Sequence, residues 1–293
     1  MIKPSELPLA ADGSLYHIHL TRSTLADKVL LVGDPDRVDM FKEIFESVDF
    51  ESRNRELHAL TGTYHGTRMT ALSTGMGCDN IDIVMTELDA ALHLDERSEW
   101  VENTERHLQL VRIGTSGSLQ ADIDCGSHVA SAYAIGLDGL MNYYREWTSG
   151  SGRLADMEEA FLQHMGLDNK LARPYCVQCS PRLLEKVGSG MHHGITATAP
   201  GFYGPQGRAV RLHPSIADLN EKLASFEWKT ESGKWKVTNL EMETSAIFGF
   251  SRMLGHEALT VCLIIANRPC GTFLNDYHPQ MRRLVGTIVE RLA

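Results

Sequence analysis

An arginine within an apolar run is the first residue of this sequence that points to chemistry. Arg112 belongs to the run 110–117, whose first half is typical of a strand buried on both faces. A buried guanidinium is costly unless a carboxylate pairs with it or it binds an anion. Gly-Thr-Ser-Gly at 114–117 adds flexible backbone N–H groups and two hydroxyls, among them that of Thr115. We therefore expect an anion site here, with a purely structural ion pair as the alternative.

A second anion site is predicted where the apolar run 29–33 ends. Gly33 lets the backbone approach a ligand closely, and Pro35 then begins a helix whose first N–H groups favour negative charge. Arg37 lies one turn into that helix, where its forked guanidinium can hold phosphate oxygens. Taken alone, the motif is equally consistent with an ordinary strand–turn–helix and a surface arginine. Another glycine-rich turn, Ser-Thr-Gly-Met-Gly at 73–77, has an arrangement common to many α/β proteins.

Two carboxylates suited to a sugar follow later in the chain. Glu241 and Glu243 flank Met242 where an extended segment enters a helix, and strand alternation places both carboxylates on one face. Carboxylates accept hydrogen bonds from vicinal hydroxyls such as those of a sugar. The alternative is a solvated helix start, at which acidic residues favour the helix dipole.

An aromatic turn at 202–208 has residue types that suit a planar base. Phe202 can stack on a ring face, while the Gln206 amide and the Arg208 guanidinium can form hydrogen bonds with the edge of a base. The alternative is a surface loop with its aromatic side chains tucked beneath it.

These groups are positioned by a predicted α/β fold, in which apolar strands alternate with amphipathic helices. The apolar runs are 29–33, 69–75, 110–117, 127–135, 195–199 and 259–267. Helices are predicted over 81–92, behind Asp79 and Asn80 as candidate caps, from about 243 to just before Gly255, and over 281–292. We predict one domain spanning 1–293, with a central mixed β-sheet flanked by helices. Segments near 95–107 and 147–170 are predicted insertions, the second with a Ser-Gly-Ser-Gly turn at 149–152 followed by a helix.

Composition and charge exclude several classes of protein. The chain has 293 residues, 43% of them hydrophobic, which is enough for one large core. The net charge of -10 and the lack of a Lys/Arg run argue against nucleic acid or an anionic membrane as partners. No apolar run reaches the roughly 20 residues of a membrane span, and residues 1–11 lack the pattern of a secretory signal. The 6 scattered cysteines fit a reducing compartment, so we expect a cytoplasmic protein.

One cysteine pair has the spacing of a metal or redox motif. Cys176 and Cys179 form Cys-x-x-Cys, but a zinc site would need a second pair at matched spacing. His192 and His193 are adjacent in sequence and lack the usual spacing of two histidine ligands. We expect neither a metal site nor a redox function at this pair.

Taken together and in order, the motifs resemble those of the nucleoside phosphorylase family, which includes uridine phosphorylases and hexameric purine nucleoside phosphorylases. The similarity runs from about residue 16 to the end of the chain, with the two insertions outside it. Each motif alone is unspecific, but their joint occurrence in this order is highly specific. The motifs are GDPDR at 33–37, STGMG at 73–77, RIGTSG at 112–117, Phe-Tyr-x-x-Gln-x-Arg at 202–208, EMET at 241–244 and Asn-Arg at 267–268.

The resemblance implies a function for individual residues. The implied phosphate ligands are Gly33, Arg37, Arg112, Thr115 and, from a neighbouring subunit, Arg55. Arg53, two residues earlier, is the alternative for this last assignment. The implied ribose ligands are Thr115, Met242, Glu243 and the neighbour's His17, which reaches the 5′-hydroxyl. The implied base ligands are Phe202, Gln206, Arg208 and Arg268. The implied catalytic residues are Arg112, Glu243, Gln206 and Arg208.

The resemblance also implies the reaction: phosphorolysis of uridine, with deoxyuridine as a further candidate substrate, to uracil and (deoxy)ribose 1-phosphate, as in pyrimidine salvage. No organic cofactor is expected, and whether potassium binds between subunits at Glu56, Met76 and Asn80 stays open. The active sites would be shared within a homodimer or a higher homo-oligomer.

Three other functions remain as alternatives. A purine nucleoside phosphorylase would have an Asp after the last core strand, and 264–269 contains none. A hydrolase of the family would not need Arg37 and Arg112. A catalytically silent subunit would only bind nucleoside or complete an oligomer.

Overall fold

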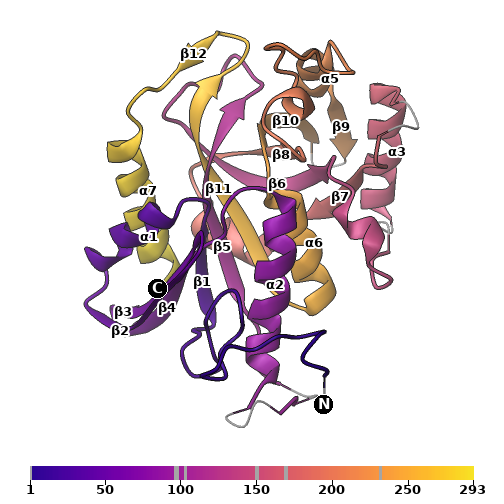
Figure 1. Ribbon diagram of the computed structural model, residues 1–293. Coiled ribbons are helices and arrows are strands. Elements are labelled where there is room, and N and C mark those ends of the chain that lie inside the picture. Colours follow the sequence, from indigo (N-terminus) through magenta and orange to yellow (C-terminus); the bar gives the residue numbers. More distant parts are fainter. Residues whose placement is uncertain (1, 96–98, 102–103, 149–151, 168–170, 231–232) are drawn as a thin grey trace.

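A mixed β-sheet forms the centre of the protein, and helices pack on its outer surfaces (Figure 1). The computed structural model describes residues 2–95, 99–101, 104–148, 152–167, 171–230 and 233–293. The strands are β1 (Lys28–Val32), β2 (Ser47–Asn54), β3 (Leu57–Tyr64), β4 (Thr67–Ser73), β5 (Gln109–Ser118), β6 (His128–Gly136), β7 (Tyr175–Gln178), β8 (His192–Thr198), β9 (Glu227–Thr230), β10 (Gly233–Glu241), β11 (Glu257–Asn267) and β12 (Thr272–Phe273).

Seven α-helices and two short 3-10 helices are found among the described residues. They are α1 (Pro35–Lys42), α2 (Cys78–His93), α3 (Arg153–Met165), α4 (Pro181–Val187), α5 (Leu219–Ser225), α6 (Thr244–Leu254) and α7 (His278–Leu292), with η1 (Leu140–Tyr143) and η2 (Gly204–Gln206). None of the helices in this part of the chain has the length and apolar character needed to cross a membrane.

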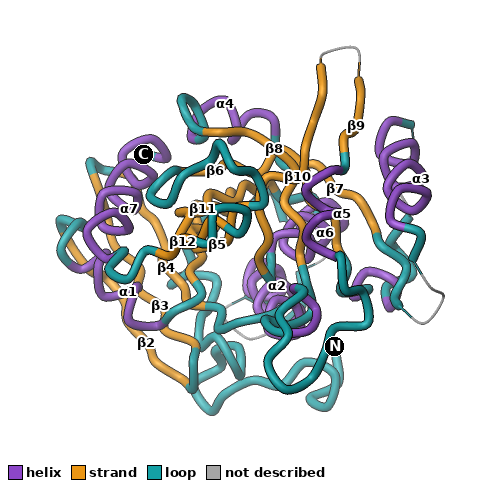
Figure 2. Tube along the Cα trace, turned by 90° about the horizontal axis from the view of Figure 1, so that it is seen from above, coloured by secondary structure: helices purple, strands orange, loops and turns teal. Residues whose placement is uncertain are grey.

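The sheet closes on itself around β5. The strand order is β12-β11-β6-β8-β10-β5-β1-β4-β3-β2, and β5 also pairs with β11. Strands β5, β11, β6, β8 and β10 therefore form a ring, from which β1 to β4 extend as an open sheet (Figure 2). The predicted central mixed sheet is confirmed, and its closure was not predicted because it depends on pairings far apart in sequence.

Parallel pairing brings three motif loops to one edge of the sheet. Strand β1 lies between β4 and β5 and is parallel to both, with Val32 opposite Ser73 and Ile113. The chain leaves β1 and β4 at this edge, so the turns at 33–37 and 74–77 lie together, beside residues 114–117 of β5. Strand β10 runs antiparallel to β5 and pairs Leu240 with Gly117, which delivers the EMET motif to the same place.

The helix predictions hold for α6 and α7, while the predicted caps of α2 are wrong. Helix α2 begins at Cys78, and its N-cap is Gly77, which forms no side-chain capping bond. Gly77 has φ 98°, a conformation that favours glycine. Asp79 and Asn80 therefore lie inside the first turn. Helix α6 ends at Leu254, before Gly255 in the left-handed conformation, as predicted.

The segment 147–170 contributes to the hydrophobic core. Its helix α3 buries Met157, Phe161 and Met165, which recur every four residues and pack into a cluster with side chains of β8 and β10. Burying a side chain of this size contributes about 1.5–3 kcal/mol. Residues 149–151 of the predicted turn lie outside the described residues. Segment 95–107 connects α2 to β5 and is only partly described.

Candidate active site

A cavity of about 650 Å³ lies at the edge of the sheet where the motif loops meet. Nine of the predicted site residues line it: Gly33, Arg37, Arg112, Thr115, Phe202, Gln206, Arg208, Met242 and Glu243. Glu56, Met76 and Asn80 also line it. His17, Arg55 and Arg268 are not among its lining residues. A second cavity of about 800 Å³ has mainly apolar walls and contains only Arg208 of the predicted residues, so the smaller cavity is the candidate site.

Arg112 is held between two buried carboxylates. Its Nη1 lies 3.2 Å from Oε2 of Glu241, and its Nη2 forms an ion pair with Glu243. Burial opposes the charge on Arg112, but the two carboxylates outweigh it and raise its pKa above the ordinary value. A Cβ at Gly114 would come within 2.0 Å of Arg112 Nη1, so only glycine leaves room for this guanidinium. The ion pair considered as the alternative for Arg112 is thus present, on a side chain that also lines the cavity.

The two glutamates have different surroundings. Glu241 accepts hydrogen bonds from Thr198 Oγ1 at 2.7 Å and from the backbone N–H groups of Glu243 and Thr244 at 3.0 Å. Together with Arg112 these contacts occupy its oxygens. Glu243 accepts one backbone bond, from Gly77 at 2.7 Å, besides its ion pair. Both residues are 4% exposed, so the interpretation as a solvated helix start is wrong.

Arg37 is buried at the same end of the cavity without a carboxylate partner among the described residues. Its Nη1 donates to the carbonyl oxygen of Ile113 at 3.1 Å. Burial lowers the pKa of Arg37, while Tyr277 and Asp34 act in the opposite direction. Asp34 caps α1 by accepting from the N–H of Asp36 at 3.0 Å. The alternative of a surface arginine is wrong, because Arg37 is only 6% exposed.

The aromatic turn forms the opposite end of the cavity. Arg208 Nη1 donates to Gln206 Oε1 at 2.6 Å and to the carbonyl oxygen of Phe202. The Arg208 guanidinium carbon lies 3.7 Å from the centroid of the Phe202 ring, a cation–π contact that occupies one ring face. Phe202 is 50% exposed, whereas Gln206 is buried, so the interpretation as aromatics tucked beneath a loop is wrong.

Arg268 adds positive charge behind this turn. Burial lowers the pKa of Arg208 to about 10, and the nearby Arg268 contributes to the shift. Nη2 of Arg268 is buried and has no hydrogen-bond partner among the described residues. A Cβ built at Gly117 would lie 3.4 Å from Arg268 Nε. The Arg268 side chain therefore packs against Gly117 of β5, which lines the cavity.

His17 and Arg55 lie away from this cavity, in two other parts of the chain. His17 Nδ1 is 2.5 Å from Oε1 of Glu87 in α2. Arg55 occupies the turn between β2 and β3 with φ 55°, is exposed, and forms no hydrogen bond or ion pair with the described residues. Arg53, in contrast, contacts Asp39 at 2.7 Å. Of the two arginines, Arg55 is therefore the one available to a ligand.

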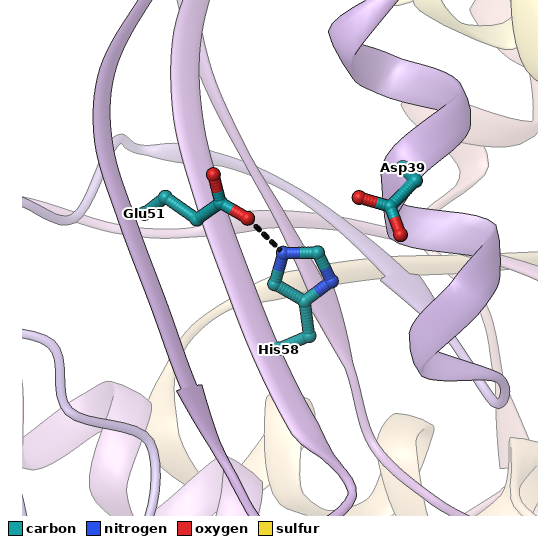
Figure 3. Close-up of side chains that lie close together, drawn as sticks. All are labelled: Asp39, Glu51 and His58. Atoms are coloured by element: carbon teal, nitrogen blue, oxygen red, sulfur yellow. Dashed lines mark hydrogen bonds and ion pairs between the residues drawn. The ribbon is translucent and has the colours of Figure 1, made fainter.

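Asp39, Glu51 and His58 form a compact group that resembles a metal site (Figure 3). Their ligand atoms lie within 4.8 Å of one another. Lys42 Nζ contacts Glu51 at 2.6 Å and Asp39 at 3.1 Å, and Arg53 also contacts Asp39. These cations neutralise the carboxylates, so the group is better explained as an ion-pair network.

Cys176 and Cys179 are buried and held in the thiol form. Burial raises the pKa of Cys179 to about 12, and that of Cys176 further. Thiolates are the species that bind zinc and attack disulfides, so this environment disfavours both roles.

Several residues of the site had no recognisable pattern in the sequence. Glu87, which contacts His17, lies 70 residues from it within an ordinary amphipathic helix. Ile265, Phe273 and Tyr277 also line the cavity, and they belong to the end of β11, to β12 and to the N-cap of α7. A contact between segments so far apart leaves no periodicity or spacing to detect.

The fold and the cavity together define a class: an α/β protein with two buried arginines, a buried pair of carboxylates and a Gln–Arg turn in one cavity at the edge of the sheet. A sequence profile of the phosphorylase superfamily matches residues 27–291. The chain belongs to this superfamily.

Three proteins similar to this chain are described as nucleoside phosphorylases. A uridine phosphorylase of Thermococcus kodakarensis is 27% identical over 271 residues, which cover 92% of this chain and 83% of that protein. A DeoD-type purine nucleoside phosphorylase of Geobacillus sp. is 28% identical and covers 85% of this chain and 84% of its own length. The crystal structure of a Trypanosoma brucei nucleoside phosphorylase, described as showing uridine phosphorylase activity, superposes with a TM-score of 0.86 at 30% identity, covering 97% of this chain and 99% of that one.

Proposed function

We propose that this protein cleaves uridine with inorganic phosphate into uracil and ribose 1-phosphate. One observation carries the proposal: a single cavity has Arg37 and Arg112 at one end, Glu243 beside them, and the Gln206–Arg208 pair at the other. The similarity to two proteins described as uridine phosphorylases supports the choice of reaction.

Each part of the cavity suits one part of the substrates. Arg37, Arg112 and Thr115 hold phosphate, with the backbone at Gly33 beside them. Glu243 accepts hydrogen bonds from the ribose hydroxyls, and Met242 packs against the sugar. Gln206 can donate through its free amide N–H groups and still accept from a ring N–H. Arg208, with Arg268 behind it, adds positive charge near the carbonyl oxygens of uracil.

The arrangement promotes bond cleavage mainly by position and charge. As the bond from C1′ to the base nitrogen stretches, the sugar gains positive charge and the base gains negative charge. The phosphate dianion stabilises the sugar, and Gln206 and Arg208 stabilise the departing uracil anion, so no general acid is required. No organic cofactor is needed for this reaction.

A shared active site follows from the charges in the cavity. Around the phosphate end, Arg37 and Arg112 carry two positive charges, and Asp34, Glu241 and Glu243 carry three negative charges, so one chain alone offers no net positive charge to a phosphate dianion. We infer that Arg55 of a neighbouring subunit supplies the missing positive charge, as the symmetry of a homodimer allows.

His17 is oriented so that it can contact the ribose bound in the neighbouring subunit's site. Its Nδ1 faces the Glu87 carboxylate, which can only accept a hydrogen bond when ionised, so the proton resides on Nδ1. The Nε2 lone pair is then free to accept a hydrogen bond from the ribose 5′-hydroxyl of the neighbouring site.

The alternative functions fit the cavity less well. A purine phosphorylase would need a carboxylic acid at the base end, but Asp276 is not among the lining residues and instead accepts from the backbone N–H of His278. A hydrolase would not need Arg37 to bind phosphate. A catalytically silent subunit would not need the complete set of phosphate, ribose and base ligands.

A monovalent cation site stays a prediction, with Asn80 Nδ2 donating to Glu56 Oε1 at 3.3 Å. If potassium binds there, replacing it with a bulky organic cation should lower activity.

The proposed reaction is tested by following uridine absorbance with and without phosphate. We expect loss of uridine only when phosphate is present and no comparable reaction of inosine. Equal kcat/KM for the two nucleosides would contradict the pyrimidine assignment, and cleavage without phosphate would indicate a hydrolase.

The shared site is tested by co-expressing Arg55→Ala and Arg37→Ala chains. In a mixed dimer, the Arg55→Ala chain keeps its own Arg37 and receives an intact Arg55 from its partner. Random pairing makes half of the dimers mixed, each with one intact site, so activity should return to about a quarter of the wild-type value. If Arg55 acts within its own chain, no site is complete and activity stays at the level of the parents.

A further inference from the structure

A tyrosine stands beside the phosphate end of the cavity and belongs to none of the motifs described above. Tyr277 lines the cavity together with Gly33, Asp34, Pro35 and Arg37. Its side chain interacts with the Arg37 guanidinium and raises the pKa of Arg37 against the opposing effect of burial. We propose that Tyr277 is a phosphate-site residue, which positions Arg37 and donates its own hydroxyl hydrogen to phosphate. This inference rests on the proposed function, in which Arg37 binds phosphate.

The backbone holds Tyr277 at this place. It is the N-cap residue of α7, and its carbonyl oxygen accepts from the N–H of Met281 at 2.9 Å. Helix α7 lies beside α1, the helix that carries Arg37, and an ion pair between Arg282 and Glu43 joins them (Figure 1). The Tyr277 ring is half-buried and packs against the hydrophobic core, with His278 stacked on it at 4.9 Å between centroids. The hydroxyl is thus carried by an anchored side chain.

The hydrogen bonds leave suitable donors for an anion. A guanidinium has five N–H groups, and among the described residues Arg37 donates one of them, from Nη1, to the Ile113 carbonyl oxygen. The Tyr277 hydroxyl belongs to the same cavity wall and has a hydrogen of its own to donate. A second oxygen acceptor at this end, such as a phosphate oxygen, would satisfy both the hydroxyl and the remaining N–H groups of Arg37.

The loop that ends at Tyr277 spans the cavity. It begins with Arg268 near the base end, passes Phe273, which is 62% exposed and lines the cavity, and reaches Tyr277 at the phosphate end. The backbone N–H of Leu274 donates to the Ile265 carbonyl oxygen at 2.8 Å and holds the middle of the loop against β11. One segment therefore contributes to both ends of the site.

The substitution Tyr277→Phe tests the proposal, because it keeps the ring and its packing and removes only the hydroxyl. We expect the KM for phosphate to rise roughly 10- to 150-fold, because the variant loses a hydrogen bond to a charged group. The KM for uridine and kcat at saturating phosphate should stay within about threefold of wild type. Tyr143→Phe removes a hydroxyl from a side chain that is 87% exposed and outside the cavity, and it should change none of these values.

A binding measurement separates this inference from the proposed reaction. Inorganic phosphate should raise the melting temperature of the wild-type protein, and the same concentration should raise that of Tyr277→Phe less. If the wild type binds phosphate but does not cleave uridine, the proposed function fails while the weaker response of Tyr277→Phe still supports the inference. An unchanged phosphate response and phosphate KM in Tyr277→Phe would overturn the inference, even if its melting temperature without phosphate is lower. A wild type that does not bind phosphate at all would overturn both.

Discussion

Replacing Arg112 should damage both catalysis and stability, whereas replacing Arg37 should damage catalysis and lower stability only slightly. Both guanidiniums are buried in the same cavity, but Arg112 contacts Glu241 and Glu243, whereas Arg37 donates to a backbone carbonyl oxygen. The contrast comes from what each substitution leaves behind. Without Arg112, two buried carboxylates face each other without a counter-charge. Without Arg37, one carbonyl oxygen loses a hydrogen bond.

The two variants should differ measurably in unfolding free energy. Breaking a buried ion pair by removing one partner costs about 3–5 kcal/mol, so Arg112→Ala should lose at least that much. Loss of the single bond to Ile113 should cost Arg37→Ala about 1 kcal/mol. Each variant also loses a charge-assisted contact to phosphate in the transition state, worth about 2–4 kcal/mol, or a fall in kcat/KM of roughly 30- to 900-fold.

Urea unfolding and phosphorolysis at low phosphate, measured on the same preparations, test this contrast. Circular dichroism at the assay temperature shows which fraction of Arg112→Ala is folded, and activity is expressed per folded molecule. Wild-type stability in Arg112→Ala would refute the ion-pair geometry. Near-normal turnover of the folded fraction at low phosphate would refute the catalytic assignment of Arg112.

Three further predictions concern the base site and the cysteines. Gln206→Leu should lower kcat/KM for uridine by about a hundredfold without creating activity toward inosine, and a gain of inosine cleavage would contradict the assignment. A thiol reagent at neutral pH should react rapidly with the exposed Cys270 and not with buried Cys179. The substitution Cys270→Ser should therefore remove the fast phase of thiol labelling. Burial raises the pKa of Cys262 to about 11 and that of Cys179 to about 12, from the ordinary 9.0, so the native protein keeps protons that the unfolded chain releases. The free energy of unfolding should therefore be unaffected by these thiols below pH 9 and fall as the pH rises from 9 toward 12, less steeply in Cys179→Ala.

The sequence predicted those parts of the fold that are encoded locally. Strands β1, β5 and β11 are buried on both faces and form near-continuous apolar runs, so their existence was evident. Strand β2 has an exposed, polar pattern, and the first half of β10 is exposed as well, so neither had an apolar run to detect. Their positions depend on pairing with partners that a local pattern does not specify.

The same distinction applies to the site. Arg112, Gly114 and Glu243 stand in short motifs, where a charged or flexible residue interrupts an expected pattern. Glu87 and Tyr277 have no such context, because their importance arises from contacts with residues on other elements. The cap prediction at Asp79 and Asn80 failed for a related reason: Gly77, with its positive φ, turns the chain into α2 two residues earlier.

The central claim is that phosphate itself becomes bonded to the sugar. Phosphorus-31 NMR of a mixture of uridine, inorganic phosphate and the purified protein tests it directly, with uracil quantified in the same sample. We expect a ribose 1-phosphate resonance to grow in equal amount with uracil while the inorganic phosphate signal declines. Uracil formed with free ribose and an unchanged phosphate signal would contradict phosphorolysis.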